Sequence, residues 1–419
     1  MPDYTLRTWI ARHIQVRQRL ERVCTAYLLF LMVVTTKHTL EEAARFSAMH
    51  KSQFSKLLKF HHNVAVQTLE SLSKQQAKRL SKSLDAVKGL PWKIVLIIDS
   101  TLQNRSSRHP ENAKTFNHGQ GFVIGHQWTN VVLILNGILI PLRPIAFYSQ
   151  RYCLDHDDVY WTEHERVVTY LSHLNLNDYM GPHRSRDVVV LTDSGYDNKK
   201  IENAIADKKW AFIIALNKRR SVKSETLYRT TPKSKQWSSV DLFFRHHRRL
   251  KWSTIRLRTN GSNAKRKAFR IRHTLGYLRY VGLVHLVCSE PKKRSEGRRR
   301  YLACNDVRAT ARQIMLGYRS RWAIELFHKN IKQILGFEDV STSSFDSVKS
   351  HVYWVYCAYI LLHMSPPGVD DMVGSLCDKR LHLQKYLDHK EKRGILQKLT
   401  QIGGVQRYKD ELRQALADG

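Results

Sequence analysis

The stretch Lys93-Ile-Val-Leu-Ile-Ile-Asp99-Ser-Thr decides the fold class, because five consecutive apolar residues in it end at an acidic one. A second stretch, Asp187-Val-Val-Val-Leu-Thr-Asp193-Ser-Gly, repeats this pattern. Short runs that are continuously apolar are typical of strands buried on both faces of a sheet. The two stretches therefore predict central strands.

The segments around these two stretches alternate in their periodicity. Residues 129–135, 138–147 and 211–216 have the apolar, β-branched character of strands, whereas residues 158–174 and 198–208 have a helical pattern. Alternation of this kind favours a mixed α/β domain over a helical bundle.

Asp99 and Asp193 each follow a predicted buried strand. Strand ends in open α/β sheets face the crevice in which ligands bind, so two carboxylates placed there can converge on one ion. An Asp at such a position more commonly caps a turn or a helix start, which is the structural alternative for each residue alone. Because the placement occurs twice, we expect the pair to converge.

A third acid lies in the segment Tyr318-Arg-Ser-Arg-Trp-Ala-Ile-Glu-Leu-Phe-His-Lys-Asn-Ile-Lys332. The pattern predicts one long helix from about residue 307 to residue 335. Steps of three, four and seven residues then place Tyr318, Arg321, Glu325 and Lys332 on one face. A polar stripe beside an apolar seam is usually solvent exposure alone. A carboxylate between an Arg and a Lys, however, suits a phosphodiester.

Three carboxylates without a thiolate or imidazole cluster favour hard cations, so we expect Mg²⁺ or Mn²⁺ rather than zinc. Two such ions about 4 Å apart can activate an attacking water or 3′-hydroxyl and stabilise the leaving oxygen. Basic side chains beside the acids would hold the scissile phosphate. The predicted chemistry is the cleavage or transfer of a phosphodiester.

The net charge of +34 indicates a polyanionic partner, since 70 Lys and Arg stand against 36 Asp and Glu. The phosphate backbone of a nucleic acid is the commonest polyanion, although a ribosomal or membrane-surface protein would carry the same sign. Residues 218–300 hold 25 Lys and Arg against 4 Asp and Glu, a local net charge of +21. Their alternating apolar and basic residues predict a β-rich insertion with one solvated, basic side.

The amino-terminal residues are helical in pattern throughout. Residues 39–58 predict a short helix, a small-residue turn near Ser47 and a second helix, at helix-turn-helix spacing. Lys51, Ser52, Gln53 and Lys56 would then face DNA. The alternative is an ordinary helical hairpin with a solvated basic face.

Several functional classes lack their sequence signals. The six cysteines are scattered and form no C-x-x-C pair, which favours a reduced compartment. The longest apolar runs fall short of the roughly 20 residues that span a bilayer, and the first residues show no signal-peptide pattern. A G-x-x-x-x-G-K-[ST] loop is also absent. We expect a cytoplasmic protein, associated with bacterial or similar DNA, that uses neither membrane nor ATP.

The acids and their neighbours resemble a known family. Asp99, the run Thr192-Asp193-Ser-Gly-Tyr and a Y-x2-R-x3-E-x6-K signature at Tyr318, Arg321, Glu325 and Lys332 are similar to the DDE transposases of insertion-sequence family four. The likeness covers about residues 93–335. It implies a ribonuclease-H-like catalytic core, interrupted between its second Asp and its Glu by a β-rich insertion.

The resemblance also implies the roles of these residues. Asp99, Asp193 and Glu325 would be the catalytic metal ligands, and Tyr318, Arg321 and Lys332 would contact DNA near the cleaved end. The likeness implies cut-and-paste transposition through a hairpinned end. It would take place in a homodimer that pairs two terminal inverted repeats and joins them to target DNA.

Some members of this family stack a flipped base on an aromatic residue of the insertion. The candidates here are Trp237, Trp252 and Tyr301. Aromatic residues in β-rich segments more often belong to the core. Tyr301 directly follows Arg298-Arg299-Arg300, and the charge of this run favours proximity to DNA.

The predicted fold is therefore an α/β, ribonuclease-H-like core with flanking helical domains. Its expected parts are a DNA-binding domain at 1–90, the core at 91–217, the insertion at 218–303, the last core helix at 304–340 and a dimerisation or DNA-contacting domain at 341–419, the last with helices near 347–363, 381–390 and 409–417. Two rival functions remain. One is a nuclease or junction resolvase without strand transfer. The other is a non-catalytic DNA-binding regulator, which the intact acid triad disfavours.

Overall fold

The computed structural model describes residues 4–85, 89–106, 109–117, 121–225, 236–246, 250–258, 266–292, 298–364, 366, 374–402, 404, 406, 409–410 and 414. They divide into two compact units, residues 1–72 with 330–419 and residues 73–329, and the boundaries fall within helices α5 (His62–Ser81) and α12 (Trp322–Gln333). Most of the helix expected at 409–417 lies outside the described residues.

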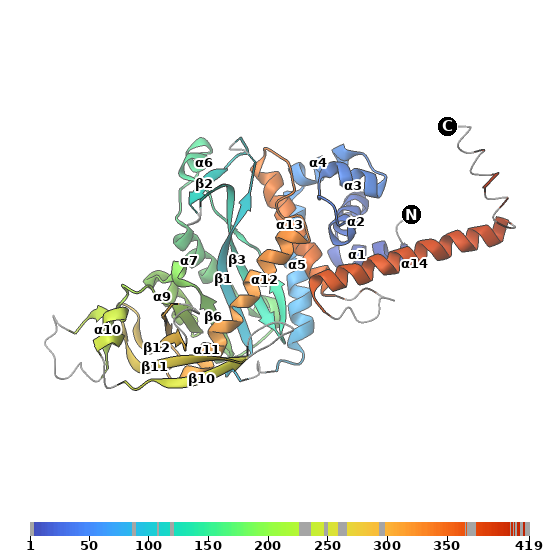
Figure 1. Ribbon diagram of the computed structural model, residues 1–419. Coiled ribbons are helices and arrows are strands. Elements are labelled where there is room, and N and C mark those ends of the chain that lie inside the picture. The colour runs from blue at the N-terminus through green and yellow to red at the C-terminus, as the bar shows by residue number, and fades with distance from the viewer. Residues whose placement is uncertain are drawn as a thin grey trace. The chain divides into compact units, whose positions relative to one another are not determined.

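Residues 73–329 are built on one mixed sheet (Figure 1). Its order over the described residues is β2-β3-β1-β6-β7-β13-β12-β11-β8-β9, with β4 and β5 beside β3 and β10 beside β11. The strands are β1 Ile94–Asn104, β2 Lys114–Asn117, β3 Phe122–Leu135, β4 Ile138–Pro141, β5 Ile145–Ala146, β6 Val188–Thr192, β7 Ala211–Ala215, β8 Ser221–Ser224, β9 Ser238–Ser239, β10 Ser253–Arg258, β11 Arg266–Leu278, β12 Gly282–Pro291 and β13 Arg300–Cys304.

The two predicted central strands are confirmed as β1 and β6, and the strand expected at residues 211–216 is confirmed as β7. The three strands run parallel to one another; β6 and β7 are buried throughout, and β1 is buried from Ile94 to Ile98. One expectation was wrong, because β1 does not end at Asp99. Its antiparallel pairing with β3 continues to the pair Asn104 and Gly125, and these ladder bonds sustain the strand after its parallel neighbour β6 has ended at Thr192.

Helices cover both faces of this sheet. Apolar residues at alternate positions of β1, β6 and β7 form one core with helices that include α7 and α9. The opposite face of β7 meets α11, where Gly317 lies close to Ile213 and Trp92. The helices of this unit, apart from α5 and α12, are α6 Gln150–Asp155, α7 Glu163–His173, α8 Asn177–Met180, α9 Lys199–Asp207, α10 Val240–His246 and α11 Ala311–Ser320, with single turns η1 Ser185–Asp187 and η2 Ser194–Tyr196.

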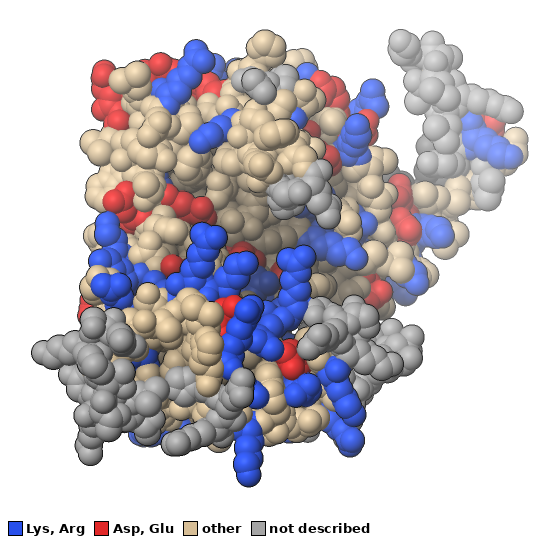
Figure 2. All heavy atoms as spheres, turned by 60° about the vertical axis from the view of Figure 1, so that its left-hand side comes forward, with Lys and Arg blue, Asp and Glu red and all other residues tan. Residues whose placement is uncertain are grey.

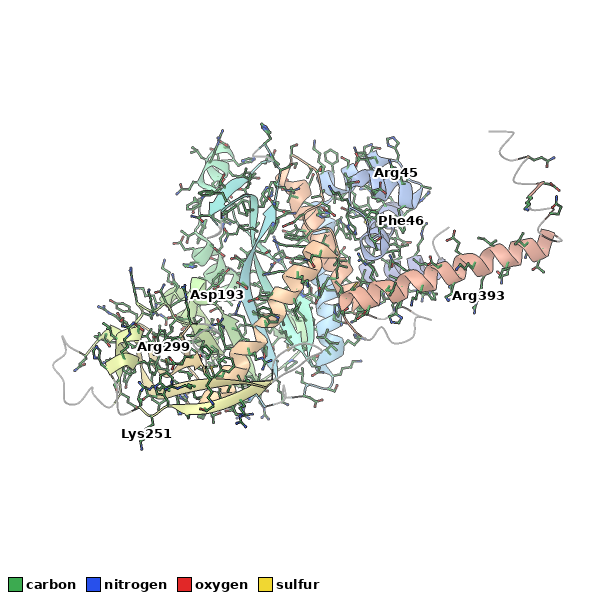
Figure 3. The ribbon with its side chains drawn as sticks, in the orientation of Figure 1. Arg45, Phe46, Asp193, Lys251, Arg299 and Arg393 are labelled. Atoms are coloured by element: carbon green, nitrogen blue, oxygen red, sulfur yellow. The ribbon has the colours of Figure 1, made fainter. Side chains whose placement is uncertain are left out.

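The basic segment is β-rich, as predicted, but its strands extend the central sheet. Strand β13 pairs with β7 on one side and with β12 on the other, so a continuous ladder joins the segment to the core. The view of Figure 2 turns this side of the molecule forward and shows Lys and Arg side chains gathered over part of the surface. In Figure 3, Arg299 and Lys251 lie beside β10–β12, and Asp193 lies nearer the middle of the sheet.

The long helix expected over 307–335 is two helices, α11 and α12, that meet at Arg321. Here the Arg321 amide donates to the Tyr318 carbonyl and the Ile324 amide donates to the Arg321 carbonyl, at 3.1 Å in both cases. These bonds span three residues instead of four, which tightens the turn and interrupts the α-helical pattern. Arg321 keeps helical dihedral angles.

The other unit is helical. The two helices expected around Ser47 are confirmed as α3 and α4, and they are joined by a turn in which Ala48 has a left-handed conformation. The helices of this unit other than α5 and α12 are α1 Tyr4–Ile14, α2 Gln18–Val33, α3 Leu40–Ser47, α4 Lys51–Phe60, α13 Phe345–Leu362 and α14 Leu376–Ile402. Among the described residues, no helix combines the length and apolar character needed to cross a bilayer.

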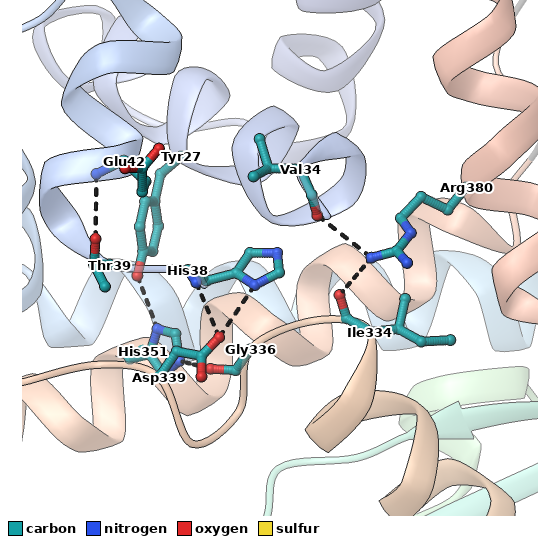
Figure 4. A network of polar contacts seen from close by, with 10 residues as sticks. All are labelled: Tyr27, Val34, His38, Thr39, Glu42, Ile334, Gly336, Asp339, His351 and Arg380. Carbon is teal, nitrogen blue, oxygen red and sulfur yellow. Dashed lines mark hydrogen bonds and ion pairs between the residues drawn. The ribbon is translucent and has the colours of Figure 1, made fainter. Parts of the chain in front are cut away.

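The amino-terminal and carboxy-terminal helices, which the sequence assigned to separate domains, share this unit because α13 packs on α2 and α4. Buried polar contacts join the same segments (Figure 4). The Tyr27 hydroxyl and His351 Nδ1 are 2.8 Å apart, and His351 Nε2 lies 2.8 Å from the Gly336 carbonyl. Arg380 of α14 donates to the carbonyls of Val34 and Ile334.

Gly336 supports a prediction about the stability of this unit. Its φ of +68° is left-handed, and an added Cβ would lie 2.5 Å from His38. We expect Gly336→Ala to lower the free energy of unfolding by about 2–4 kcal/mol, measured by denaturant titration. Gly394→Ala in α14 is the matched control, since a Cβ there meets nothing within 4 Å. Wild-type stability of Gly336→Ala would contradict this packing.

Candidate active site

The register of two parallel strands brings two acids together. Ile98 of β1 is paired with Thr192 of β6, so the next residues, Asp99 and Asp193, lie on neighbouring strands. Because side chains alternate along a strand, both project to the face opposite the one that Ile98 and Thr192 occupy. The predicted convergence of these two acids follows directly from this register.

Glu325 comes to the same place from helix α12. Ile324 and Phe327, one residue before and two residues after Glu325, are fully buried and anchor the helix. Arg321, one turn before Glu325, donates from Nη1 to Asp99 Oδ2 at 2.7 Å and from Nη2 to Glu325 Oε1 at 2.5 Å. A single guanidinium group therefore bridges the acid of strand β1 and the acid of α12.

The pKa of Asp99 reflects both its burial and its charged neighbours. The pKa of Asp99 is raised to about 6, mainly by burial; the charges of Asp193 and Glu325 contribute to the rise, and Arg321 and the Ser100 amide oppose it. The Asp99 side chain is only 14% exposed. The site thus holds more negative charge than Arg321 alone offsets.

Asp193 combines the two roles considered for it. Its Oδ1 accepts a hydrogen bond of 2.8 Å from the Gly195 amide, which caps the single turn η2. The same carboxylate interacts electrostatically with Asp99, Arg321 and Tyr318. Capping the turn therefore fixes Asp193 while it remains part of the acidic site.

Helix α12 has a second attachment close to the acids. Asn130 of β3 is paired with Asp99 in the sheet and is fully buried. Its Nδ2 lies 2.8 Å from Nε2 of His328, which follows Glu325 by three residues. The sequence analysis missed both residues. A polar Asn within the apolar run of β3 is the signal that could have indicated them.

Tyr318 and Arg300, which were also predicted to contact DNA, lie near Arg321. Tyr318 has a raised pKa because of burial, and the charges of Arg321 and Arg300 oppose this effect. Arg321 Cζ is 5.9 Å from the centre of the Tyr318 ring. Tyr318, Arg321 and Arg300 consequently form a partly basic border to the acidic site.

Tyr301 does not belong to this border, and its expected exposure to DNA is wrong. It is 5% exposed, stacks on Phe244 and donates to Asp241 Oδ1 at 2.5 Å. Neighbouring residues of a strand project to opposite faces, so Tyr301 enters the core while Arg300 is exposed. The sequence Arg298-Arg299-Arg300-Tyr301 alone did not indicate which face of the sheet each side chain occupies.

The other two aromatic candidates are only partly buried. Trp252 has three guanidinium groups around its ring, with Cζ of Arg272 at 4.4 Å, of Arg270 at 4.8 Å and of Arg299 at 5.8 Å. Lys223 Nζ lies 5.1 Å from the ring of Trp237. Arg298 is exposed, while Arg299 also pairs with Glu290.

The remaining predicted DNA contacts belong to the helical unit. Lys332 lies two turns after Glu325 on α12 and pairs with Glu338 at 3.1 Å. Lys51, Gln53 and Lys56 are exposed on α4, and Lys51 also pairs with Glu41 of α3. Exposure on the second helix of the pair is compatible with the helix-turn-helix hypothesis.

The acidic site offers the kind of ligand that a divalent cation binds. Its potential ligands are carboxylate oxygens, which suit Mg²⁺ and Mn²⁺, and a bound cation would favour the ionised form of Asp99, which burial disfavours. Over the described residues, no three His, Cys, Asp or Glu side chains already form a compact ligand cluster. Arg321 instead links Asp99 and Glu325. The donor chemistry fits a hard cation.

Fold and site define the chain as a mixed α/β protein with a carboxylate site bordered by arginines. Residues 163–361 match a family model described as the transposase DDE domain. The matched segment contains Asp193, Arg321 and Glu325, and Asp99 precedes it. No curated protein matches the chain. The family match supports a DDE transposase, and a domain of this kind suggests transposase activity and a role as a nuclease and strand transferase.

The raised pKa of Asp99 predicts a dependence of stability on pH. Because the folded-state pKa, about 6, exceeds the usual 3.8, ionised Asp99 destabilises the fold above about pH 6, and this effect disappears as the pH falls toward 4. Asp99→Asn removes the charge. Between pH 4.5 and 7.5, without divalent metal, we expect the stability of the variant relative to wild type to rise by about 2 kcal/mol. A difference that is constant with pH would contradict the raised pKa.

Proposed function

We propose that this chain is a transposase that cuts DNA at the ends of a mobile element and joins those ends to target DNA. The observation that carries the proposal is the meeting of Asp99, Asp193 and Glu325 from two parallel strands and one helix. The family match over residues 163–361 supports the same activity.

The finer family assignment has structural support. The strand order β4-β3-β1-β6-β7, with β6 and β7 parallel to β1 and β3 antiparallel to it, supports the ribonuclease-H-like core that the resemblance implies. Tyr318, Arg321 and Glu325 of the Y-R-E-K signature gather beside Asp99 and Asp193. We therefore propose that the chain belongs to insertion-sequence family four.

Asp99, Asp193 and Glu325 would hold the metal, which we propose to be two Mg²⁺ or Mn²⁺ ions. Bound ions of this kind activate the attacking hydroxyl group and stabilise the leaving oxygen of an in-line displacement. Asp99 must be ionised to act as a ligand, so binding would weaken below about pH 6.

The basic border of the site would hold DNA. Arg321 and Arg300 offer planar, bidentate donors for the phosphate groups on either side of the scissile bond, and the Tyr318 hydroxyl offers a further donor. Arg321 contacts Asp99 and Glu325, and Tyr318 interacts electrostatically with both Arg321 and Arg300. They would therefore orient the phosphodiester relative to the carboxylates and draw the DNA into the site.

Other surfaces would hold the rest of the DNA. The exposed residues Lys51, Gln53 and Lys56 of α4 suit a recognition helix in the major groove. In the basic segment, Arg298 and Arg299 extend the positive surface. Trp252, half-buried among three arginines, is the aromatic candidate best suited to stack on a base beside the backbone.

We further propose cut-and-paste transposition through a hairpin intermediate, in a homodimer that pairs two terminal inverted repeats. This part of the proposal follows from the assignment to the family. It places the protein on bacterial DNA, with Lys332 of the signature as an additional DNA contact near the cleaved end.

Removal of single acids tests the reaction. With Mg²⁺ and DNA that carries the native element ends, we expect Asp99→Asn, Asp193→Asn and Glu325→Gln to reduce cleavage by at least about 1,000-fold while the Kd for DNA changes little. The control Asp157→Asn replaces an exposed carboxylate in the loop between α6 and α7. We expect it to cleave like wild type.

Each alternative gives a different result in this assay. Binding of the element ends without cleavage by the wild type would favour a non-catalytic regulator. Cleavage without any joined product would favour a nuclease or resolvase. Cleavage by one of the three acid variants at the wild-type rate would overturn its assignment as a ligand.

The basic border gives a second prediction. We expect DNA affinity to fall steeply with salt, and Arg300→Ala to weaken binding and lower the slope of log K against log [salt] by about 1, because one phosphate contact is lost. Arg151→Ala, on the exposed surface of α6, is the control and should leave the slope unchanged. A slope for Arg300→Ala equal to that of wild type would remove Arg300 from the DNA interface.

A further inference from the structure

The first turn of helix α7 holds a carboxylate that the sequence analysis did not select. Thr162 and Glu165 form a capping box that starts this helix at Glu163. Glu163 Oε1 accepts hydrogen bonds from the Tyr196 hydroxyl at 2.6 Å and the Thr129 hydroxyl at 2.7 Å. Its Oε2 accepts from Gln127 Nε2 at 2.7 Å. One carboxylate thus joins the start of α7, strand β3 and the turn η2.

The residue after Glu163 contacts the same turn. His164 Nε2 lies 2.8 Å from the Gly195 carbonyl, so this nitrogen carries the proton and donates it. His164 Nδ1 then accepts from Asn198 Nδ2 at 3.1 Å. Glu163 and His164 together therefore hold the turn of residues 194–196 through its backbone and through the Tyr196 side chain.

This turn carries Asp193. Gly195, whose carbonyl accepts from His164, donates its amide to Asp193 Oδ1 at 2.8 Å. Tyr196 is 3% exposed, and burial together with the charge of Glu163 raises the pKa of its hydroxyl well above the usual value, so it remains a donor. Both contacts made by α7 thus act within three residues of the acid.

The contacts of Glu163 lie on the other side of the sheet from the acids. Thr129 is paired with Ser100, the neighbour of Asp99, whereas Asp99 itself is paired with Asn130. Because side chains alternate, Thr129 and Gln127 face α7, and Asp99 faces the opposite side. Glu163 can therefore fix the turn without touching the reacting groups.

We propose that Glu163 is a positioning residue that fixes the Asp193 turn on strand β3 and thereby keeps Asp193 beside Asp99. The inference rests on the proposed function, since it assigns Asp193 as a ligand. Glu163 is suited to this role because a carboxylate only accepts hydrogen bonds and receives three here. A glutamine has only one acceptor oxygen. Its NH₂ group is a donor and would face one of the groups that now donate to Glu163.

The test compares Glu163→Gln and Tyr196→Phe with Glu165→Gln. Glu165 is the matched control, because it lies in the same helical turn but bonds Thr162 and Lys200 instead of the Asp193 turn. Amide hydrogen exchange of residues 194–197 reports the turn without metal or DNA. Mn²⁺ affinity, measured by electron paramagnetic resonance, reports the acids, and single-turnover cleavage at saturating DNA reports the reaction.

We expect faster amide exchange in Glu163→Gln and Tyr196→Phe, and Mn²⁺ affinity and cleavage rate lower by about 10–100-fold, as for other groups that orient metal ligands. The Kd for DNA should stay at the wild-type value. Glu165→Gln should match the wild type in all three measurements. Tyr196→Phe keeps the ring in the core, so it still tests the role if Glu163→Gln fails to fold.

The opposite results overturn the inference. Wild-type exchange, Mn²⁺ affinity and cleavage in both variants would show that the turn holds Asp193 without Glu163. Equal losses in Glu165→Gln would show a general effect on α7. If wild-type protein does not cleave DNA, the proposed function fails, whereas amide exchange still decides whether Glu163 holds the turn.

Discussion

The parallel pairing of β1 with β6 is the constraint on which the site depends. This register makes Asp99 and Asp193 neighbours across two strands, and the apolar residues that precede them hold both strands in the centre of the sheet. A shift by one residue would turn each acid to the other face. The burial of Ile94–Ile98 and Val188–Leu191 therefore fixes the position of the carboxylates as firmly as it fixes the core.

Arg321 offsets part of the negative charge at this position. Its guanidinium group satisfies one oxygen of Asp99 and one of Glu325, while Asp193 is held by its own turn. Removing a buried partner from such a pair leaves a costly unpaired charge. The interrupted helical pattern at Arg321 places this side chain between two acids that lie far apart in the sequence, on a strand and on a helix.

The sequence predicted the central strands, the β-rich character of the basic segment and the residues Asp99, Asp193 and Glu325 that come together. These features depend on apolar runs and on helical spacing, which are local. It did not predict the extension of β1 beyond Asp99, the core position of Tyr301 or the contacts of Glu163. These depend on which strands pair and on which face of the sheet a side chain occupies, and only long-range packing decides both.

The ladder from β7 through β13 to β12 has a mechanical consequence. Backbone hydrogen bonds connect β7, the neighbour of β6, to β13, β12 and β11 without an intervening linker; β11 carries Arg270, and Arg299 directly precedes β13. Changing the distance between the arginine-rich strands and the carboxylates would require breaking those bonds. If DNA binds here as proposed, it meets a surface of fixed spacing, so any adjustment between the two places falls to the nucleic acid.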